Sequence, residues 1–154
     1  MTSSALTVEA RRAAFVEAAR SMIGCEWSHQ ARTPGVAVDC GGLVVCASAS
    51  VGITMADVCG YSRRPWPERM LEAMGTNFAR LDVAHPSAAP VGAVLLFGIK
   101  RRDRPQHLAV WTGGGTFVHS WADFRKVVES PFDPYWAERL HSIWDFREAT
   151  WQAQ

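Results

Sequence analysis

The chain has no apolar run long enough to cross a membrane, and it has almost no net charge. A membrane-spanning helix needs about 20 consecutive apolar residues, and no stretch of the 154 residues approaches that length. Sixteen Lys and Arg stand against fifteen Asp and Glu, which gives a formal net charge of +1. A balance this even gives no reason to expect a nucleic-acid partner. The composition therefore predicts neither a membrane span nor binding to nucleic acid.

Cysteine is scarce, and its spacing matches no common metal site. Cys25, Cys40, Cys46 and Cys59 form no C-x-x-C pair and no cluster with histidine, so we expect no metal and no other cofactor. The first residues lack the basic region and apolar stretch of a signal peptide, so we expect synthesis in a cytosol, where thiols stay reduced. Except for Cys40, we expect these cysteines to be small buried residues.

Length and composition predict one folded domain over residues 1–154, because 48% of the residues are apolar and 20% are charged. Helices are expected first and strands afterwards, which is an α+β pattern with an antiparallel sheet. The expected helices cover residues 8–23, 40–51 and 68–74, the last ended by Gly75. The expected strands cover residues 93–97, 107–112, 116–120, 125–129 and 141–146, with a short helix over 134–140 and loops over 26–38 and 53–66.

Cys40 stands where a helix N-terminus would favour chemistry at its sulfur. Asp39 precedes it, and Gly41 and Gly42 are poor helix formers that suit a close approach to the backbone. The unpaired N–H groups and the positive end of the helix dipole favour the thiolate, which is the form that attacks a carbonyl carbon. We therefore expect the pKa of Cys40 to lie below the free-cysteine value of about 8.5. The alternative is that Cys40 is a small buried apolar residue.

His107 and His119 are candidates for the base that a thiol nucleophile needs. They lie in two β-rich runs joined by three glycines at 113–115, which predicts a hairpin. With a three-residue loop, His107 faces Trp121, and the two histidines project from the same face as diagonal neighbours. A two-residue turn would place them on opposite faces of the sheet. The hairpin register therefore decides whether the two imidazoles meet.

Three segments, in this order, resemble the NlpC-type family of papain-like cysteine peptidases, which hydrolyse cell walls. Residues 39–44 (DCGGLV) are similar to the family's D-C-x-G-L/F-V motif at a helix start. Residues 107–111 are similar to its strand H-V-G-I-Y, and residues 117–119 are similar to its F-I/V-H. The resemblance extends over about residues 14–128. It implies a papain-like NlpC-type fold, with the nucleophile at a helix N-terminus packed on an antiparallel sheet.

The resemblance also implies a Cys–His–His triad and a substrate. Cys40 would attack, His107 would take and return the proton, and His119 would orient His107. The substrate class implied is the peptidoglycan stem peptide, cut between γ-D-glutamyl and a diamino acid.

Four further positions are carried over from the family as substrate-binding residues. Asp39 matches a carboxylate that helps to recognise the free amine of a short stem peptide. His29 lies in the region of an upstream Tyr near the oxyanion and is the best candidate to replace it. Gly41 stands where Ser is commoner, and Trp111 ends the motif that begins with His107.

Residues 29–32 (HQAR), 57–65 and 125–129 are similar to the branch of this family found in tailed bacteriophages and gene transfer agents. That branch implies a tail-tip protein of a phage-like particle that helps the particle breach the cell wall. It also implies a protein made in the bacterial cytoplasm without a signal peptide. Its partners would be other tail-tip proteins.

Two other functions stay open beside endopeptidase activity. One is structural assembly of a tail tip with a weak or idle triad, which predicts an occluded cleft and an ordinary pKa for Cys40. The other is an intracellular amidase or acyltransferase on the same fold, which predicts a deep apolar channel beside Cys40. The basic run at 100–104 also has two interpretations, a solvated loop or a region that gathers an anionic substrate near His107.

Overall fold

Three helices and a six-stranded antiparallel sheet form the framework of the protein in a computed structural model, which describes residues 6–57 and 67–153. The helices are α1 (Val8–Ser21), α2 (Cys40–Ser50) and α3 (Pro67–Asn77). The sheet has the strand order β3-β8-β4-β5-β6-β7. Its strands are β3 (Phe78–Arg80), β4 (Val94–Phe97), β5 (His107–Trp111), β6 (Thr116–Trp121), β7 (Lys126–Pro131) and β8 (Leu140–Phe146). The expected α+β class is confirmed.

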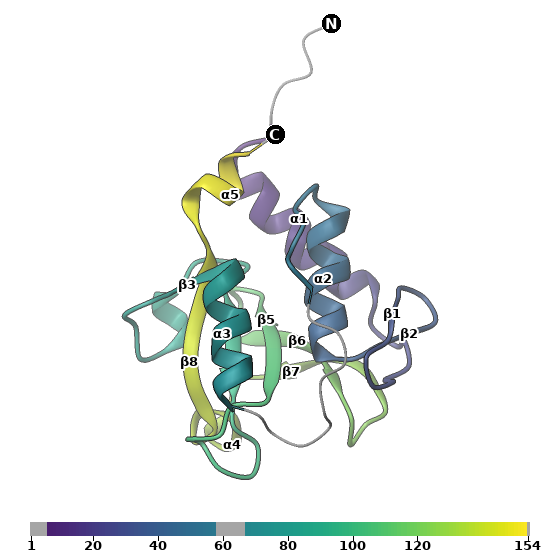
Figure 1. The fold of residues 1–154 in the computed structure, drawn as a ribbon, viewed down its shortest axis with the longest axis vertical. Helices are drawn as coiled ribbons and strands as arrows, with labels where there is room; N and C mark the ends of the chain where they lie inside the picture. The colour runs from purple at the N-terminus through teal and green to yellow at the C-terminus, as the bar shows by residue number, and fades with distance from the viewer. Residues whose placement is uncertain (1–5, 58–66, 154) are drawn as a thin grey trace, which may run out of the picture.

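Smaller elements complete the described chain. They are a two-stranded hairpin of β1 (Arg32–Thr33) and β2 (Ala37–Val38), a 3₁₀ turn (Pro86–Ala88), α4 (Pro134–Ala137) and α5 (Glu148–Gln152). Figure 1 shows α1 and α2 side by side, with α3 in front of the sheet. None of the described helices is long and apolar enough to cross a membrane.

The sheet separates two hydrophobic clusters, because side chains alternate between its faces along each strand. On β5, Leu108 and Val110 pack with the side chains of α1 and α2. Ala109 and Trp111 point into the second cluster, which also contains Trp136 of α4. Both faces of β5 are therefore buried, and its side chains are held in place from two sides.

The first turn of α2 is fixed by the segment that precedes β1. The Asp39 carboxylate caps the helix by accepting a 2.8 Å hydrogen bond from the N–H of Gly42, and such caps contribute about 1 kcal/mol. A Cβ on Gly42 would overlap the carbonyl oxygen of Ala31. Glycine is therefore required here, because the backbone at Ala31 lies directly against the helix.

The structure corrects three expected boundaries. α3 does not end at Gly75 but continues to Asn77, whose side-chain amide donates to the carbonyls of Ala73 and Ala56 and closes the helix end. The fourth helix is shorter than expected and stops at Ala137, since Leu140 already belongs to β8. β7 begins at residue 126 and runs to 131, rather than over 125–129, because the residue before it turns with a positive φ of 56°.

Three short elements were not expected. The hairpin β1–β2 lies within the expected loop over 26–38. β3 and α5 are too short for a periodic sequence pattern, and they form because tertiary contacts bury them. Phe78 of β3 pairs with Phe146 of β8, and Trp151 of α5 packs on Phe15 of α1.

The hairpin between β5 and β6 has the register that a three-residue loop requires. Val110 pairs with Val118 and Trp111 with Phe117, and the N–H of Thr112 donates to the carbonyl of Thr116 at 3.1 Å. The loop is the glycine triplet, in which the first and third glycines have φ values of 87° and 84°. The prediction that His107 and His119 share a face is confirmed.

We expect Gly42→Ala to lower the free energy of unfolding by about 2 kcal/mol or more, since the added methyl group must displace backbone. Gly75→Ala is the matched control within another helix. Nothing lies within 4 Å of its Cβ position, so that change should raise stability by up to about 1 kcal/mol. Urea denaturation of both variants tests this, and equal effects of the two substitutions would contradict it.

Candidate active site

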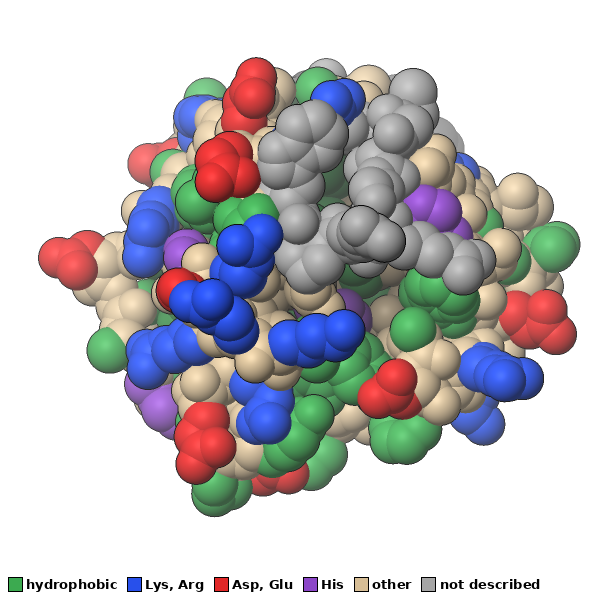
Figure 2. All heavy atoms as spheres, turned by 60° about the horizontal axis from the view of Figure 1, so that its bottom comes forward, with side chains coloured by type: hydrophobic (Ala, Val, Ile, Leu, Met, Phe, Trp, Pro, Cys, Tyr) green, Lys and Arg blue, Asp and Glu red, His purple; other side chains and the backbone are tan. Residues whose placement is uncertain are grey.

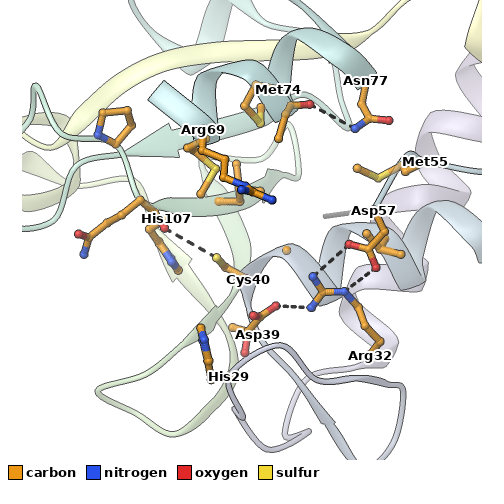
Figure 3. Close-up of a pocket in the computed structure, with 18 of the residues that line it drawn as sticks. His29, Arg32, Asp39, Cys40, Met55, Asp57, Arg69, Met74, Asn77 and His107 are labelled. Carbon is orange, nitrogen blue, oxygen red and sulfur yellow. Dashed lines mark hydrogen bonds and ion pairs between the residues drawn. The ribbon is translucent and has the colours of Figure 1, made fainter. Parts of the chain in front are cut away.

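Cys40 lies in the wall of a cavity of about 390 Å³. α2 provides Cys40, the first residue of β5 is His107, and His29 comes from the segment before β1. Figure 3 shows Cys40 between His107 on one side and the Arg32–Asp57 pair on the other. Much of the remaining wall is apolar and consists of Val45, Met55, Met70, Met74 and Phe78.

The protein environment keeps the Cys40 thiol protonated. Burial raises its pKa to about 11, and the negative charge of Asp39 acts in the same direction. The backbone N–H groups of Leu108 and Gly41 lower the pKa of the thiol but only partly offset these two effects. The sulfur lies 4.0 Å from the carbonyl oxygen of Gln106. The expectation of a lowered pKa is therefore wrong, because burial and the adjacent carboxylate outweigh the helix N-terminus.

Two buried histidines form a hydrogen-bonded chain behind Cys40. His107 Nε2 lies 2.8 Å from His119 Nδ1, and His119 Nε2 lies 2.8 Å from the hydroxyl of Ser130. Since Nε2 of His107 is engaged by His119, Nδ1 is the ring nitrogen that remains for a contact within the cavity that His107 and Cys40 both line. The predicted contact between the two histidines is confirmed.

In the hydrogen-bonded row of His107, His119 and Ser130, only one arrangement of the ring protons lets His107 act as a base through Nδ1. His107 must then carry its proton on Nε2 and donate it to Nδ1 of His119. His119 in turn carries its proton on Nε2 and donates it to the Ser130 oxygen. The Ser130 hydroxyl can accept or donate, so it accommodates the tautomer that leaves Nδ1 of His107 unprotonated.

Aromatic side chains surround the two histidines. The His119 ring lies 4.7 Å from Phe117 and 5.1 Å from Trp136, and the His107 ring lies 5.0 Å from Trp121, between ring centroids. Burial lowers the pKa of His119 to about 3. Burial and the neighbouring His119 also hold the pKa of His107 well below its usual value. Both imidazoles are therefore neutral at neutral pH.

The structure brings three of the four expected substrate-binding residues to the cavity. Asp39, His29 and Gly41 all line it. Asp39 is only 3% exposed. Trp111 is a correction, because it is buried in the second hydrophobic cluster against Phe132 and does not belong to the cavity wall. It lies on the same face of β5 as His107 but at the opposite end of the strand, where the core closes over it.

Two of the other three cysteines lie among the described residues. Cys25 and Cys46 are free and buried, as expected, and Cys59 lies outside the described residues. Within the described ranges, no group of three His, Cys, Asp or Glu side chains is placed to hold a metal ion.

The basic run at 100–104 lies in the loop between β4 and β5, beside the cavity. Ile99 and Pro105, which flank it, both line the cavity. Arg101 pairs with Asp103 at 2.8 Å in an exposed ion pair, and Arg102 donates to the carbonyl of Leu140. Figure 2 shows Lys and Arg side chains gathered on one side of the face it presents, with acidic side chains scattered around the rim.

Sequence reasoning missed three functional candidates. Ser130 belongs to the histidine chain, and its place opposite Phe117 follows only from the pairing of β6 with β7. Arg32 and Asp57 form an ion pair at the cavity edge, with the guanidinium Nε 2.9 Å from the carboxylate. Both belong to stretches singled out by resemblance, but twenty-four residues separate them in the sequence.

A protein-family model described as the NlpC/P60 family matches residues 24–145. The chain belongs to the NlpC/P60 family. The match covers the cysteine at the start of α2 and both strands that carry the histidines. No curated protein matches the chain by sequence.

Solved structures confirm the NlpC/P60 fold. An NlpC/P60 family protein from Bacillus cereus is 20% identical with a TM-score of 0.66, covering 88% of this chain and 40% of the other. The peptidoglycan hydrolase RipB from Mycobacterium tuberculosis is 18% identical with a TM-score of 0.62, covering 88% of this chain and 64% of the other. RipD from the same organism, described as a non-catalytic domain adapted to peptidoglycan binding, is 16% identical with a TM-score of 0.62, covering 94% and 99%.

This chain therefore spans less than two thirds of several of its structural neighbours, and 47% of NlpC1 from Trichomonas vaginalis. At identities of 20% or lower, these likenesses establish the fold. The family includes catalytic and non-catalytic members, so the activity of this chain depends on its own site.

We expect the rate of Cys40 alkylation by iodoacetamide to rise about tenfold per pH unit between about pH 7 and about pH 10. The reason is that the raised pKa keeps the thiolate a minor species over this whole range. Peptide mass spectrometry separates Cys40 from the other cysteines. His107→Ala should show the same slope. If the rate for the parent protein instead reached a plateau near neutral pH, and this variant lost that plateau, Cys40 and His107 would form a thiolate–imidazolium pair.

We expect the protein to lose stability as the pH falls from about 6.5 to about 5. Unfolded histidines take up protons there, whereas folded His107 and His119 stay neutral because their pKa values are lowered. Each contributes a slope of up to about 1.4 kcal/mol per pH unit. Urea unfolding across this range should give a shallower slope for His119→Gln, and identical slopes for the variant and the parent would refute the assignment.

Proposed function

We propose that this protein is a cysteine endopeptidase that cleaves peptidoglycan stem peptides between γ-D-glutamyl and a diamino acid. The observation that carries the proposal is the buried His107–His119 chain beside Cys40, at the wall of an accessible cavity. Membership of the NlpC/P60 family supports the substrate class, as does the peptidoglycan hydrolase among the structural neighbours.

In the first half of the proposed reaction, the Cys40 sulfur attacks the scissile carbonyl carbon while its proton passes to Nδ1 of His107. The backbone N–H groups at the start of α2, including that of Gly41, stabilise the oxyanion. The C–N bond then breaks, and His107 returns the proton to the leaving amine. The product is a thioester between Cys40 and the γ-D-glutamyl group.

In the second half, water attacks the thioester carbonyl and gives a proton to His107. The carbon–sulfur bond breaks, and the proton returns to the sulfur. Because both groups are neutral at rest, proton transfer accompanies attack and does not precede it. His119 stays neutral throughout and orients His107 through the 2.8 Å hydrogen bond.

We further propose that the protein acts in the tail tip of a phage or phage-like particle. The support is the similarity of three sequence stretches to that branch, together with their proximity in the fold. Arg32 of the first stretch pairs with Asp57 of the second. The carbonyl of Arg125, in the third, accepts a hydrogen bond from Trp27 at 2.8 Å, two residues before the first stretch. His29 and Arg32 of the first stretch and Asp57 of the second line the cavity, a position suited to substrate selection.

A second candidate function is acyl transfer or amide hydrolysis on an apolar substrate. The observation that favours it is the apolar wall opposite Cys40, with Met55, Met70 and Met74, because methionine adapts to irregular apolar ligands. The structural alternative receives less support. It predicts an occluded cleft, whereas a cavity adjoins Cys40. The raised pKa of the thiol does not separate the two functions, because it leaves the sulfur protonated at rest in either case.

We expect Cys40→Ala to abolish release of peptides from purified peptidoglycan while the circular dichroism spectrum is unchanged. His107→Ala should lose comparable activity, since members of a catalytic unit act together. His119→Ala should cost less, on the order of 10–100-fold, because His119 orients the base and transfers no proton.

A fully active Cys40→Ala protein would exclude cysteine catalysis. Hydrolysis of p-nitrophenyl octanoate provides a comparison with the second candidate. If wild-type protein cleaves this ester through Cys40 but leaves stem peptides intact, the apolar-substrate function replaces the endopeptidase.

A further inference from the structure

The carboxylate next to the nucleophile is already occupied. Asp39 Oδ1 accepts from the N–H of Gly42 at 2.8 Å and pairs with Arg32 Nη1 at 2.7 Å. Its Oδ2 accepts from the N–H of Gln30 at 2.8 Å. With 3% exposure, this carboxylate lines the cavity but has its charge neutralised within the protein.

The same guanidinium also holds a second carboxylate. Arg32 Nε and Nη2 donate to the two oxygens of Asp57 at 2.9 and 3.1 Å. A further N–H of Nη1 donates to the carbonyl of Ala31 at 3.0 Å. The planar fork of arginine suits such a bidentate contact. Arg32 therefore links the start of α2 to the opposite edge of the cavity, as Figure 3 shows.

Several local features serve to hold Arg32 in this position. Gly42 leaves room for the backbone at Ala31, and a Cβ there would also come within 3.0 Å of Arg32 Nη1. Gln30 adopts a positive φ of 61°, which is uncommon for a residue with a side chain, and this turn aims its N–H at Asp39. The pairing is thus built into the backbone of the segment and does not depend on a flexible surface side chain.

A cationic group on a substrate would gain little from this carboxylate. An incoming ammonium would have to displace Arg32 or share Asp39 with it, and leaving a buried charge unpaired costs several kcal/mol. A neutral amide at the same place meets no such competition. The occupied pair therefore disfavours substrates that carry a free amine beside the scissile residue.

Resting on the proposed function, we infer that this site takes stem peptides whose amino end is blocked as an amide, and that Arg32 sets this preference by neutralising Asp39. A stem peptide still joined to its glycan strand has such a blocked end, whereas a short peptide released from the wall has a free amine. Arg32 acts here as a specificity-determining residue, and the expected substrate is the intact wall.

The test compares two ligands, L-Ala-γ-D-Glu-diaminopimelate with a free amine and the same peptide acetylated at its amino end. Calorimetry measures the binding of each to Cys40→Ala protein, and mass spectrometry measures their cleavage by protein with Cys40 intact. We expect the acetylated peptide to bind at least as tightly as the free-amine peptide. Tighter binding of the free-amine peptide would overturn the inference.

Substitutions at Arg32 test its role directly. Arg32→Met, in the Cys40→Ala background, should shift the ratio of the two affinities at least tenfold toward the free amine, since Asp39 then lacks its cation. Arg32→Lys keeps the charge and should keep the parent preference. Arg12→Met is the control for the loss of any Arg–Asp ion pair. Arg12 lies on α1, and its Nη2 is 2.7 Å from a carboxylate oxygen of Asp145. Melting temperatures establish that each variant is folded.

The outcomes separate this inference from the proposed function. If Arg32→Met left the ratio of the two peptide affinities unchanged, Arg32 would not determine the preference for a blocked amino end. Binding of the acetylated peptide without cleavage would overturn the endopeptidase activity and leave the binding preference standing. If neither peptide bound, the substrate class would be wrong, and the inference would fall with it.

Discussion

The Asp39 carboxylate is the interaction on which the site depends. It caps α2, fixes the turn at Gln30 and pairs with Arg32, so one side chain positions both the start of α2, where Cys40 lies, and the cavity edge. Because it precedes Cys40 directly, its charge also raises the pKa of the thiol. The carboxylate thus holds the geometry of the site, while burial, with a smaller contribution from the charge of Asp39, keeps the sulfur protonated at rest.

A neutral resting site follows from this arrangement and from the aromatic surroundings of the histidines. Trp121, Trp136 and Phe117 exclude water from His107 and His119, which makes an imidazolium costly. In the proposed reaction, ionisation of the Cys40–His107 pair would have to be stabilised by the bound substrate, through its developing oxyanion. Such a site would show little reactivity toward small electrophiles and would use binding energy to reach the transition state.

The parts of the site that sequence reasoning predicted are those that local patterns encode. Asp39 before two glycines marks a helix start, and the glycine triplet fixes the hairpin register that joins His107 to His119. The assigned role of Trp111 was wrong. Strand alternation predicts which face of the sheet a residue points from, but it does not predict whether that part of the face lines the cavity or the hydrophobic core. Ser130 gave no local indication, since it meets His119 only through the pairing of two strands. The contacts of Arg32 with Asp39 and Asp57 follow from the path of the loops, which local patterns do not give.

The sequence alone determined the main element classes, the place of Cys40 at the start of a helix and the histidine pair, because caps, turns and strand alternation act over a few residues. The tertiary structure decided the protonation state of the thiol, the partner of Asp39 and the nature of the cavity walls. The reason is that burial and charge pairing depend on which segments pack together in the fold, and local sequence patterns do not encode that packing.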